Sequence, residues 1–282
     1  MKNNAIETIK ERYSVRNYLD KPFEKEQIQK IQEFFSECKT GPFGNEVRFE
    51  IVDLSEMEKN EIKSLGTYGM ISGGKVYIAG IVKRTQSNME DLGYCMEKLI
   101  LFLTQIGIGT CWMGGTFNRS NFAKKIHLEK NEILPAITPI GFIAEKKTFK
   151  ENIIRSMVGA KKRKPHQEIF FEGSVNNPLD FTQVGKYREV LESVRLAPSA
   201  SNKQPWCLIK DKDGNYNLYL NENTVYNNTI PEIKIQNIDM GIAMCHFELS
   251  ANELSIKGEW IKEEPKIDCG KLKYIATWTE RN

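Results

Sequence analysis

Histidine and organised cysteine are scarce in this sequence of 282 residues, and their scarcity excludes several kinds of site. The three histidines, His127, His166 and His246, form no recognisable catalytic arrangement, so we expect each to be structural or exposed. The six cysteines are scattered, without a CxxC pair or a histidine at ligand spacing. This pattern fits reduced thiols and argues against a zinc site.

The sequence also lacks a large charge excess, an apolar leader and an uncharged apolar run. A formal net charge of +3 is too small to indicate nucleic acid or an anionic membrane as a partner. The first ten residues, MKNNAIETIK, contain no apolar core, so we expect a cytoplasmic protein. Within the most apolar segment, 92–115, the polar residues Glu97, Lys98 and Gln105 argue against a membrane helix.

Apolar residues make up 40% of the chain and charged residues 27%, which suits a soluble protein with a sizeable core. The segment that begins at Leu92 is expected to form a buried helix, ended by Gly107 and Gly109. One face of that helix is continuously apolar at the i, i+3, i+4, i+7 spacing, through Leu92, Met96, Leu99, Leu103 and Ile106.

An internal repeat divides the chain. Residues 91–112 align with residues 239–260 without a gap and share six of 22 positions, including an Asp-x-Gly start and a tryptophan after the helix. Aligning Asn45 with Asn202 places an apolar strand after each asparagine. We therefore predict two related halves, 1–165 and 166–282, and a composite site at their pseudo-two-fold interface if two ancestral subunits fused.

Two segments carry candidate binding residues. In RYSVRNY (12–18), Arg12, Ser14 and Arg16 alternate at the end of an expected helix over 5–12, so their side chains can converge on one anion. From spacing alone, a solvent-facing basic turn is an equally good interpretation. The basic pair at 162–163 could add a cationic contact. In RLAPSASNKQPW (195–206), hydroxyls, amides and an indole gather in one loop, which indicates recognition.

These motifs resemble the signatures of the nitroreductase family of FMN-dependent flavoproteins. RYSVRNY followed by KPFEKEQIQKI resembles the opening of the family, and APSASNKQPW resembles its second signature. LGTYG (65–69), the apolar segment 91–117 and LPAITPIGF (134–142) extend the resemblance over nearly the whole chain, specifically to the double-length branch labelled "putative TM nitroreductase". The resemblance implies an α+β, nitroreductase-like fold: a fused pseudo-dimer with a mixed central sheet flanked by helices.

The resemblance also implies where FMN binds. In the family, an Arg/Ser motif and a late arginine hold the phosphate, glycine backbone lies near flavin N5, and a Pro-Ser-x-x-Asn loop reaches the flavin from the partner subunit. Carried over, the implied cofactor-binding residues are Arg12, Ser14, Arg16, Tyr68, Gly69, Gly114, Gly115, Arg163, Pro198, Ser199, Ser201 and Asn202. The first half lacks the serines and keeps Asn45, and the second half lacks the arginine motif, so we expect one complete site per chain.

The implied activity is electron transfer from NAD(P)H through FMN to a small organic acceptor, nitroaromatic or quinone-like, by a ping-pong route. The chemistry would occur on the flavin, without a catalytic side chain. A monomer that acts as a pseudo-dimer is expected. Two alternatives stay open: an FMN-binding storage or sensor protein without turnover, and an FMN enzyme of different chemistry, such as dehalogenation or flavin breakdown.

Overall fold

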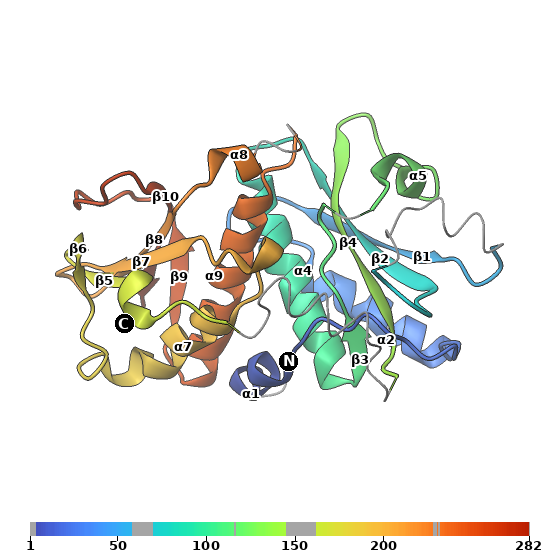
Figure 1. Cartoon of the computed structure of the whole chain (residues 1–282), viewed down its shortest axis with the longest axis horizontal. Coiled ribbons are helices and arrows are strands. Elements are labelled where there is room, and N and C mark those ends of the chain that lie inside the picture. The colour runs from blue at the N-terminus through green and yellow to red at the C-terminus, as the bar shows by residue number, and fades with distance from the viewer. Residues whose placement is uncertain are drawn as a thin grey trace. The chain divides into compact units, whose positions relative to one another are not determined.

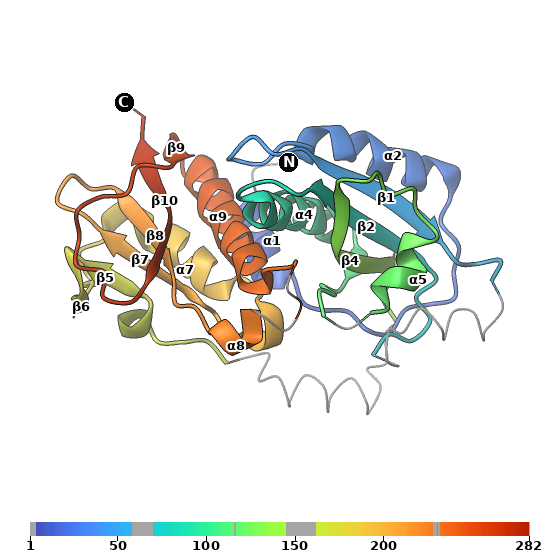
Figure 2. The same ribbon diagram turned by 90° about the horizontal axis from the view of Figure 1, so that it is seen from above.

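The computed structural model of the chain describes residues 4–57, 70–115, 117–144, 162–227, 230 and 232–281. Among these residues the strands form two sheets, and each sheet belongs to a separate unit (Figures 1 and 2). The four-stranded unit comprises Glu11–Asn88 and Cys95–Ala160. The six-stranded unit comprises Met1–Lys10, Met89–Tyr94 and Lys161–Asn282.

The sheet of the four-stranded unit is antiparallel, in the order β1-β2-β4-β3. Its strands are β1 (Val47–Asp53), β2 (Val76–Lys83), β3 (Ile108–Thr110) and β4 (Glu132–Phe142). The central strands β2 and β4 are rich in Val, Ile and Ala and are buried over nearly their whole length. Such runs without alternation are expected where a strand is covered on both faces.

The helices of this unit are α2 (Lys25–Phe35), the 3₁₀ turn η1 (Ser36–Cys38), α4 (Asn88–Gln105) and α5 (Arg119–Ala123). The start of α4 is grouped with the other unit. Phe34 of α2 stacks on Phe102 of α4 at a centroid distance of 3.9 Å. Phe122 of α5 packs edge-on against Tyr77 of β2 and belongs to one buried apolar cluster with it.

The sheet of the six-stranded unit has the order β6-β5-β7-β8-β10-β9. Its strands are β5 (Phe170–Glu172), β6 (Ser174–Pro178), β7 (Trp206–Lys210), β8 (Tyr216–Leu220), β9 (Gly258–Ile261) and β10 (Lys273–Glu280). The pair β5–β7 is parallel and the other pairs are antiparallel, so this sheet is mixed.

The helical segments of this unit are α1 (Ala5–Glu11), η2 (His166–Glu168), η3 (Gly185–Tyr187), α7 (Arg188–Leu196), η4 (Ala200–Asn202), α8 (Thr224–Asn227) and α9 (Ile235–Glu253). α9 packs against α7 and against the strands β7, β8 and β9 (Figure 1). Phe247 of α9 forms an aromatic cluster with Trp260 and Trp278, at ring-centroid distances of 5.2 and 5.1 Å.

The α+β fold class is confirmed, and so is the buried helix before Gly107. Leu92, Met96, Leu99 and Leu103 of α4 are all fully buried, and Gly107 has φ +76°, the left-handed geometry that ends a helix. The strands lie in two sheets, whereas the sequence suggested one mixed central sheet, because strand pairing is set by contacts far apart in the chain. The boundary between the predicted halves at residue 165 stays a prediction.

Two glycines allow the beginnings of α4 and α9 to pack closely within the six-stranded unit. A Cβ on Gly93 would lie 2.1 Å from the carbonyl oxygen of Ile238, and a Cβ on Gly241 would lie 1.9 Å from that of Glu90. The offset of 148 residues that aligns Asp91 with Asp239 also relates Gly93 to Gly241 and Glu90 to Ile238. The two contacts are therefore reciprocal, as contacts across a two-fold axis are.

Candidate cofactor site

The RYSVRNY segment of the four-stranded unit runs beside β3. Ser14 forms a parallel bridge with Thr110, and the backbone N–H of Val15 donates to the Thr110 carbonyl at 2.8 Å. The N–H of Tyr18 donates to the Ser72 carbonyl at 2.9 Å. Val15 is buried. Because side chains alternate along extended backbone, Ser14 and Arg16, on either side of Val15 in the chain, are expected to project to the side opposite Val15.

The two arginines of this segment differ in their surroundings. Arg12 is nearly buried, and its Nε lies 3.7 Å from Oε1 of Glu97, which is fully buried in α4. The other oxygen of Glu97 accepts a hydrogen bond from Trp112 Nε1 at 2.6 Å. Arg16 makes no ion pair within the described part of the chain, and its Nε and Nη1 are buried there without a hydrogen-bond acceptor. Buried guanidinium donors are costly unless an acceptor meets them, so Arg16 is available for an anion.

The predicted glycines follow in the loop after β3. Met113 and Ile137 exchange two backbone hydrogen bonds of 3.0 Å, which fix the start of this loop on β4. Gly114 is half-buried, and a Cβ there would have no atom within 4 Å among the described residues. Gly115 is exposed. The loop therefore presents accessible backbone close in sequence to Thr110, the residue that pairs with Ser14.

The Pro198–Gln204 segment of the six-stranded unit has an unusual backbone. Ser201, Asn202 and Gln204 have φ angles of 49°, 54° and 48°, in the left-handed region that residues other than glycine seldom adopt. Each such residue costs on the order of 1 kcal/mol or more, so the surrounding contacts must hold the loop in place. Strain of this kind concentrates at binding and catalytic loops.

Arg163, far away in the sequence, contacts Asn202 of this loop. Arg163 Nη1 donates to Asn202 Oδ1 at 3.2 Å, and Arg163 Nη2 donates to the Leu196 carbonyl at 3.1 Å. Asn202 Nδ2 donates to the carbonyl of Lys162 at 2.9 Å. The hydroxyl of Ser199 accepts the backbone N–H of Gln204 at 2.8 Å. Polar groups that the resemblance assigned to the cofactor therefore also stabilise the loop itself.

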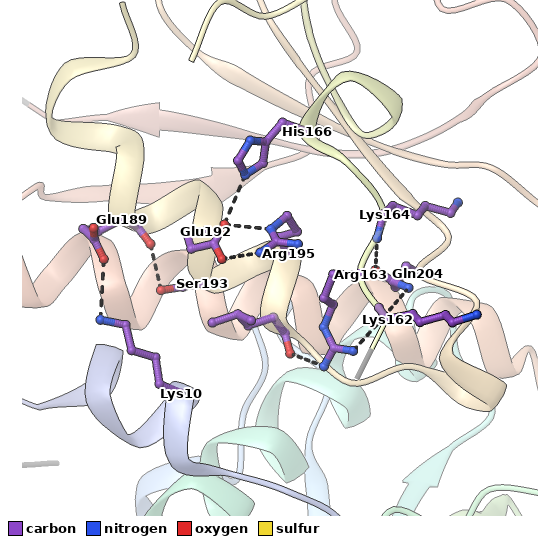
Figure 3. A network of polar contacts seen from close by, with 11 residues as sticks. Lys10, Lys162, Arg163, Lys164, His166, Glu189, Glu192, Ser193, Arg195 and Gln204 are labelled. Atoms are coloured by element: carbon purple, nitrogen blue, oxygen red, sulfur yellow. Dashed lines mark hydrogen bonds and ion pairs between the residues drawn. The ribbon is translucent and has the colours of Figure 1, made fainter. Parts of the chain in front are cut away.

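Three residues that contact the predicted segments were not themselves predicted as functional. Gln204 is buried, and its Oε1 accepts the backbone N–H of Lys164 at 2.9 Å (Figure 3). Asp239 of α9 accepts the backbone N–H of Ala200 at 2.9 Å, and its complete burial raises its pKa well above the usual value. Glu97 appeared in the sequence only as a charge within an apolar helix. Its position within a helix expected to be buried was the available indication that it has a partner.

The predicted site residues fall into two clusters, one in each unit. Arg12, Ser14, Arg16, Gly114 and Gly115 belong to the four-stranded unit. Arg163, Pro198, Ser199, Ser201 and Asn202 belong to the six-stranded unit. Tyr68 and Gly69 lie outside the described residues.

The surrounding helix α7 is fixed by ordinary polar contacts. Arg195 makes a bidentate pair with Glu192, at 2.7 and 2.6 Å, and His166 contacts the same carboxylate at 3.2 Å (Figure 3). His166 also stacks on Phe181 at a centroid distance of 3.7 Å. His246 is buried, and its Nδ1 lies 2.8 Å from the Ser193 carbonyl oxygen. Both histidines therefore have the structural roles expected of them.

The described residues contain no cluster of His, Cys, Asp or Glu that could hold a metal ion. All six cysteines are free thiols, and burial raises the pKa of Cys207 to about 11. In the part of the chain that the structure describes, no helix has the length and apolar character needed to cross a membrane.

Comparisons with known proteins identify a family and a fold. The family model described as "Putative TM nitroreductase" matches residues 4–251. A solved structure described as a "putative nitroreductase" from Thermotoga maritima MSB8 aligns with 98% of this chain and 92% of its own, at 20% identity and a TM-score of 0.60. That likeness shows a shared nitroreductase-like fold. No curated protein matches the chain significantly.

Two other solved structures align with about half of the chain. One is described as a "Putative NADH dehydrogenase/NAD(P)H nitroreductase" from Bacteroides thetaiotaomicron VPI-5482, with 22% identity, a TM-score of 0.42, and coverage of 52% of this chain and 91% of its own. The other is an "FMN-dependent Nitroreductase" from Clostridium difficile R20291, with 19% identity, a TM-score of 0.39, and coverage of 50% and 88%.

Proposed function

The chain belongs to the family described as "Putative TM nitroreductase", and on that premise we propose that it is an FMN-dependent oxidoreductase. The proposed reaction transfers electrons from NAD(P)H to a small organic acceptor, nitroaromatic or quinone-like. Bound FMN would supply the reversible uptake of two electrons. Family membership supports oxidoreductase chemistry in general, and the donor and acceptor are our proposal.

The observation that carries the FMN proposal is the state of Arg16. Its buried Nε and Nη1 have no acceptor among the described residues, and Ser14 projects from the same side of the same extended segment. A phosphate monoester is the ligand that matches such donors, because guanidinium forks bind its oxygens through charge-assisted hydrogen bonds. Arg12 would add positive potential, moderated by Glu97 at 3.7 Å.

The other residues would bind and orient the cofactor. Gly114, where a Cβ would meet no described atom within 4 Å, and the exposed Gly115 suit close approach to a flat ring, since neither carries a side chain. In the six-stranded unit, Arg163 and Lys162 bring positive charge to the Pro198–Gln204 loop, and Ser199, Ser201 and Asn202 carry polar groups there. We propose that this loop contacts the ring side of a bound FMN, and that each chain holds one FMN.

The reciprocal contacts of Gly93 and Gly241 support the pseudo-dimer. In a homodimer, a two-fold interface repeats each contact with the partners exchanged. Here two helices of one chain do so at aligned positions. One chain would then provide the surroundings that an ordinary family dimer builds from two, and a monomer would suffice for function.

Cofactor content tests the first part of the proposal. The purified chain is expected to show a flavin spectrum, and released FMN should saturate at one per chain. Two FMN per chain would contradict the proposed stoichiometry. Anaerobic addition of NADH or NADPH should bleach the bound flavin, and a quinone or nitroarene should restore it, with parallel double-reciprocal plots for a ping-pong order. Flavin that neither donor bleaches would favour the storage or sensor alternative.

Arg16→Gln tests the phosphate assignment. Loss of a charge-assisted contact should weaken FMN about ten- to a hundred-fold, equivalent to roughly 1.5–3 kcal/mol. Riboflavin, which lacks the phosphate, should bind both proteins almost equally. Arg84→Gln, at an exposed arginine of the same unit, is the matched control and should leave FMN affinity unchanged. Equal losses for FMN and riboflavin would place Arg16 away from the phosphate.

A further inference from the structure

A polar pocket lies in the six-stranded unit beside the Pro198–Gln204 loop. Its volume is about 430 Å³, which falls in the range of roughly 300–1,000 Å³ typical of small-molecule sites. It is lined by Lys164, Lys203, Pro205, Asn221, Glu222, Asn223, Thr224 and Gln236. None of these residues is among the predicted cofactor-binding residues, although Lys203 lies in the Pro198–Gln204 loop.

Gln204 holds the two lysines of this pocket at neighbouring positions. Its side-chain Oε1 accepts the backbone N–H of Lys164 at 2.9 Å (Figure 3), and Lys203 directly precedes it in the chain. The buried Gln204 side chain also donates to the Asn202 carbonyl at 3.1 Å. A network of buried polar contacts therefore fixes the backbone from which both lysine side chains extend.

The charge balance of the lining favours an anion. Lys164 and Lys203 make no ion pair within the described residues. Glu222 also lines the pocket, but Lys273 forms an ion pair with it and Asn227 Nδ2 donates to it at 2.9 Å; both contacts lower its pKa. Gln236 lies in the first turn of α9, where the helix adds partial positive charge. Two like charges near each other are unfavourable until an anion neutralises them.

We propose that this pocket binds the phosphorylated end of a nucleotide, with Lys164 and Lys203 as the phosphate ligands. The amides of Asn221, Asn223 and Gln236 and the hydroxyl of Thr224 supply neutral partners for the sugar or base. Because the chain is proposed to oxidise NAD(P)H, an assignment that rests on the proposed function, the nucleotide is NADPH. Its 2′-phosphate distinguishes it from NADH, so the lysines would set donor preference.

Calorimetric titration of the full-length, FMN-treated chain tests the proposal directly. The probes are adenosine 2′,5′-bisphosphate, adenosine 5′-monophosphate and inorganic phosphate. The bisphosphate should bind most tightly, and Lys164→Gln and Lys203→Gln should each weaken it about ten-fold, since each removes one charged phosphate contact. Lys212→Gln, in an exposed turn of the same unit, should have no effect. Added salt should weaken the wild-type interaction.

The outcomes separate this pocket from the FMN site. Lys164→Gln should leave FMN affinity unchanged, and in turnover it should raise KM for NADPH and not for NADH. The proposal is overturned if the bisphosphate fails to bind, if neither lysine matters, if inorganic phosphate binds equally well, or if Lys164→Gln weakens FMN. If the chain binds the bisphosphate but does not bind FMN and does not oxidise NADPH, the proposed nucleotide pocket stands and the proposed oxidoreductase function is refuted.

Discussion

The long helices α4 and α9 have matching sequences and different chemistry at one buried position. Both have an Asp-x-Gly triplet near their beginning, and both are followed by a tryptophan. At the position where α4 has Glu97, the alignment places Cys245 in α9, and both side chains are fully buried. Trp112 donates its indole N–H to Glu97 at 2.6 Å, whereas Trp260 donates to the backbone carbonyl of Met244 at 3.3 Å.

The difference follows the arginines. The four-stranded unit contains Arg12, whose guanidinium lies against Glu97, and the second half of the sequence has no Arg-x-Ser-x-Arg motif. A buried carboxylate costs several kcal/mol unless a cation and hydrogen bonds accompany it. Where the cation is missing, the neutral thiol of Cys245 occupies the position at no electrostatic cost. The comparison indicates that Glu97 serves the arginine motif and not the helix.

The strongest test of the likeness between the two helices is their glycine contact. Gly93→Ala and Gly241→Ala each place a Cβ about 2 Å from a backbone carbonyl oxygen, which cannot move without shifting a helix. Each should lower the free energy of unfolding by about 3 kcal/mol or more, measured by urea denaturation. Gly114→Ala, where the added Cβ meets no described atom, should leave stability nearly unchanged. A large loss of unfolding free energy in only one of the two variants, Gly93→Ala or Gly241→Ala, would show that the two contacts are not equivalent.

A double-mutant cycle tests the dependence of Glu97 on Arg12. Arg12→Gln should cost about 3 kcal/mol, because it leaves the Glu97 carboxylate buried without its cation. Adding Glu97→Gln restores a neutral core like that around Cys245 while an amide oxygen still accepts from Trp112. The double variant should therefore be more stable than the sum of the single losses by about 1–3 kcal/mol. Additive losses would mean that the 3.7 Å contact contributes no coupling.

Much of this arrangement could be predicted from sequence because it is local. Apolar periodicity located α4, and Gly107 marked its end, whereas the convergence of Arg12, Ser14 and Arg16 on one anion stays a prediction. The pairing of strands into two sheets was not predictable in this way, since β5 pairs with β7 across more than thirty residues. Glu97, Gln204 and Asp239 act through partners 15 to 85 residues away in the chain, and residue spacing gives no sign of such contacts.

The two loop asparagines extend the comparison between the halves. Asn202 has φ 54° and bonds Arg163 and the Lys162 carbonyl. Asn45 donates to the Gln86 carbonyl at 2.9 Å and accepts from Thr85 at 2.5 Å. Asn202→Ala loses both side-chain contacts and places alanine at positive φ, so it should cost about 2 kcal/mol. Asn202→Gly also loses the side-chain contacts, but glycine adopts positive φ without strain, so this variant should lose less stability.

Thermal unfolding and FMN affinity of both Asn202 variants separate loop geometry from direct contact. If Asn202 acts by shaping the loop, the glycine variant should retain most of its FMN affinity. If the amide contacts the flavin, both variants should lose affinity equally, by roughly 1 kcal/mol. Asn45→Ala should leave FMN affinity unchanged, because one complete site per chain does not include that loop.

The last test concerns Asp239, whose effect on stability has a sign that is set by pH. Complete burial raises the pKa of Asp239 in the folded chain, so the fold carries no penalty at a pH below the unfolded pKa. A penalty then grows as pH rises toward the folded pKa, by at most about 1.4 kcal/mol per pH unit.

Asp239→Asn cannot titrate, and its oxygen can still accept the N–H of Ala200. The variant should therefore gain stability over wild type as pH rises from 4 to 8. Asp180→Asn is the control of opposite sign. Hydrogen bonds from Thr182 lower the pKa of the exposed Asp180, so its stabilising contribution is lost only as pH falls below its usual pKa, and the difference between this variant and wild type should stay nearly flat from pH 4 to 8. A difference between Asp239→Asn and wild type that stays flat across the whole range would show that Asp239 ionises normally in the fold, and that the N–H of Ala200 is held by a charged carboxylate.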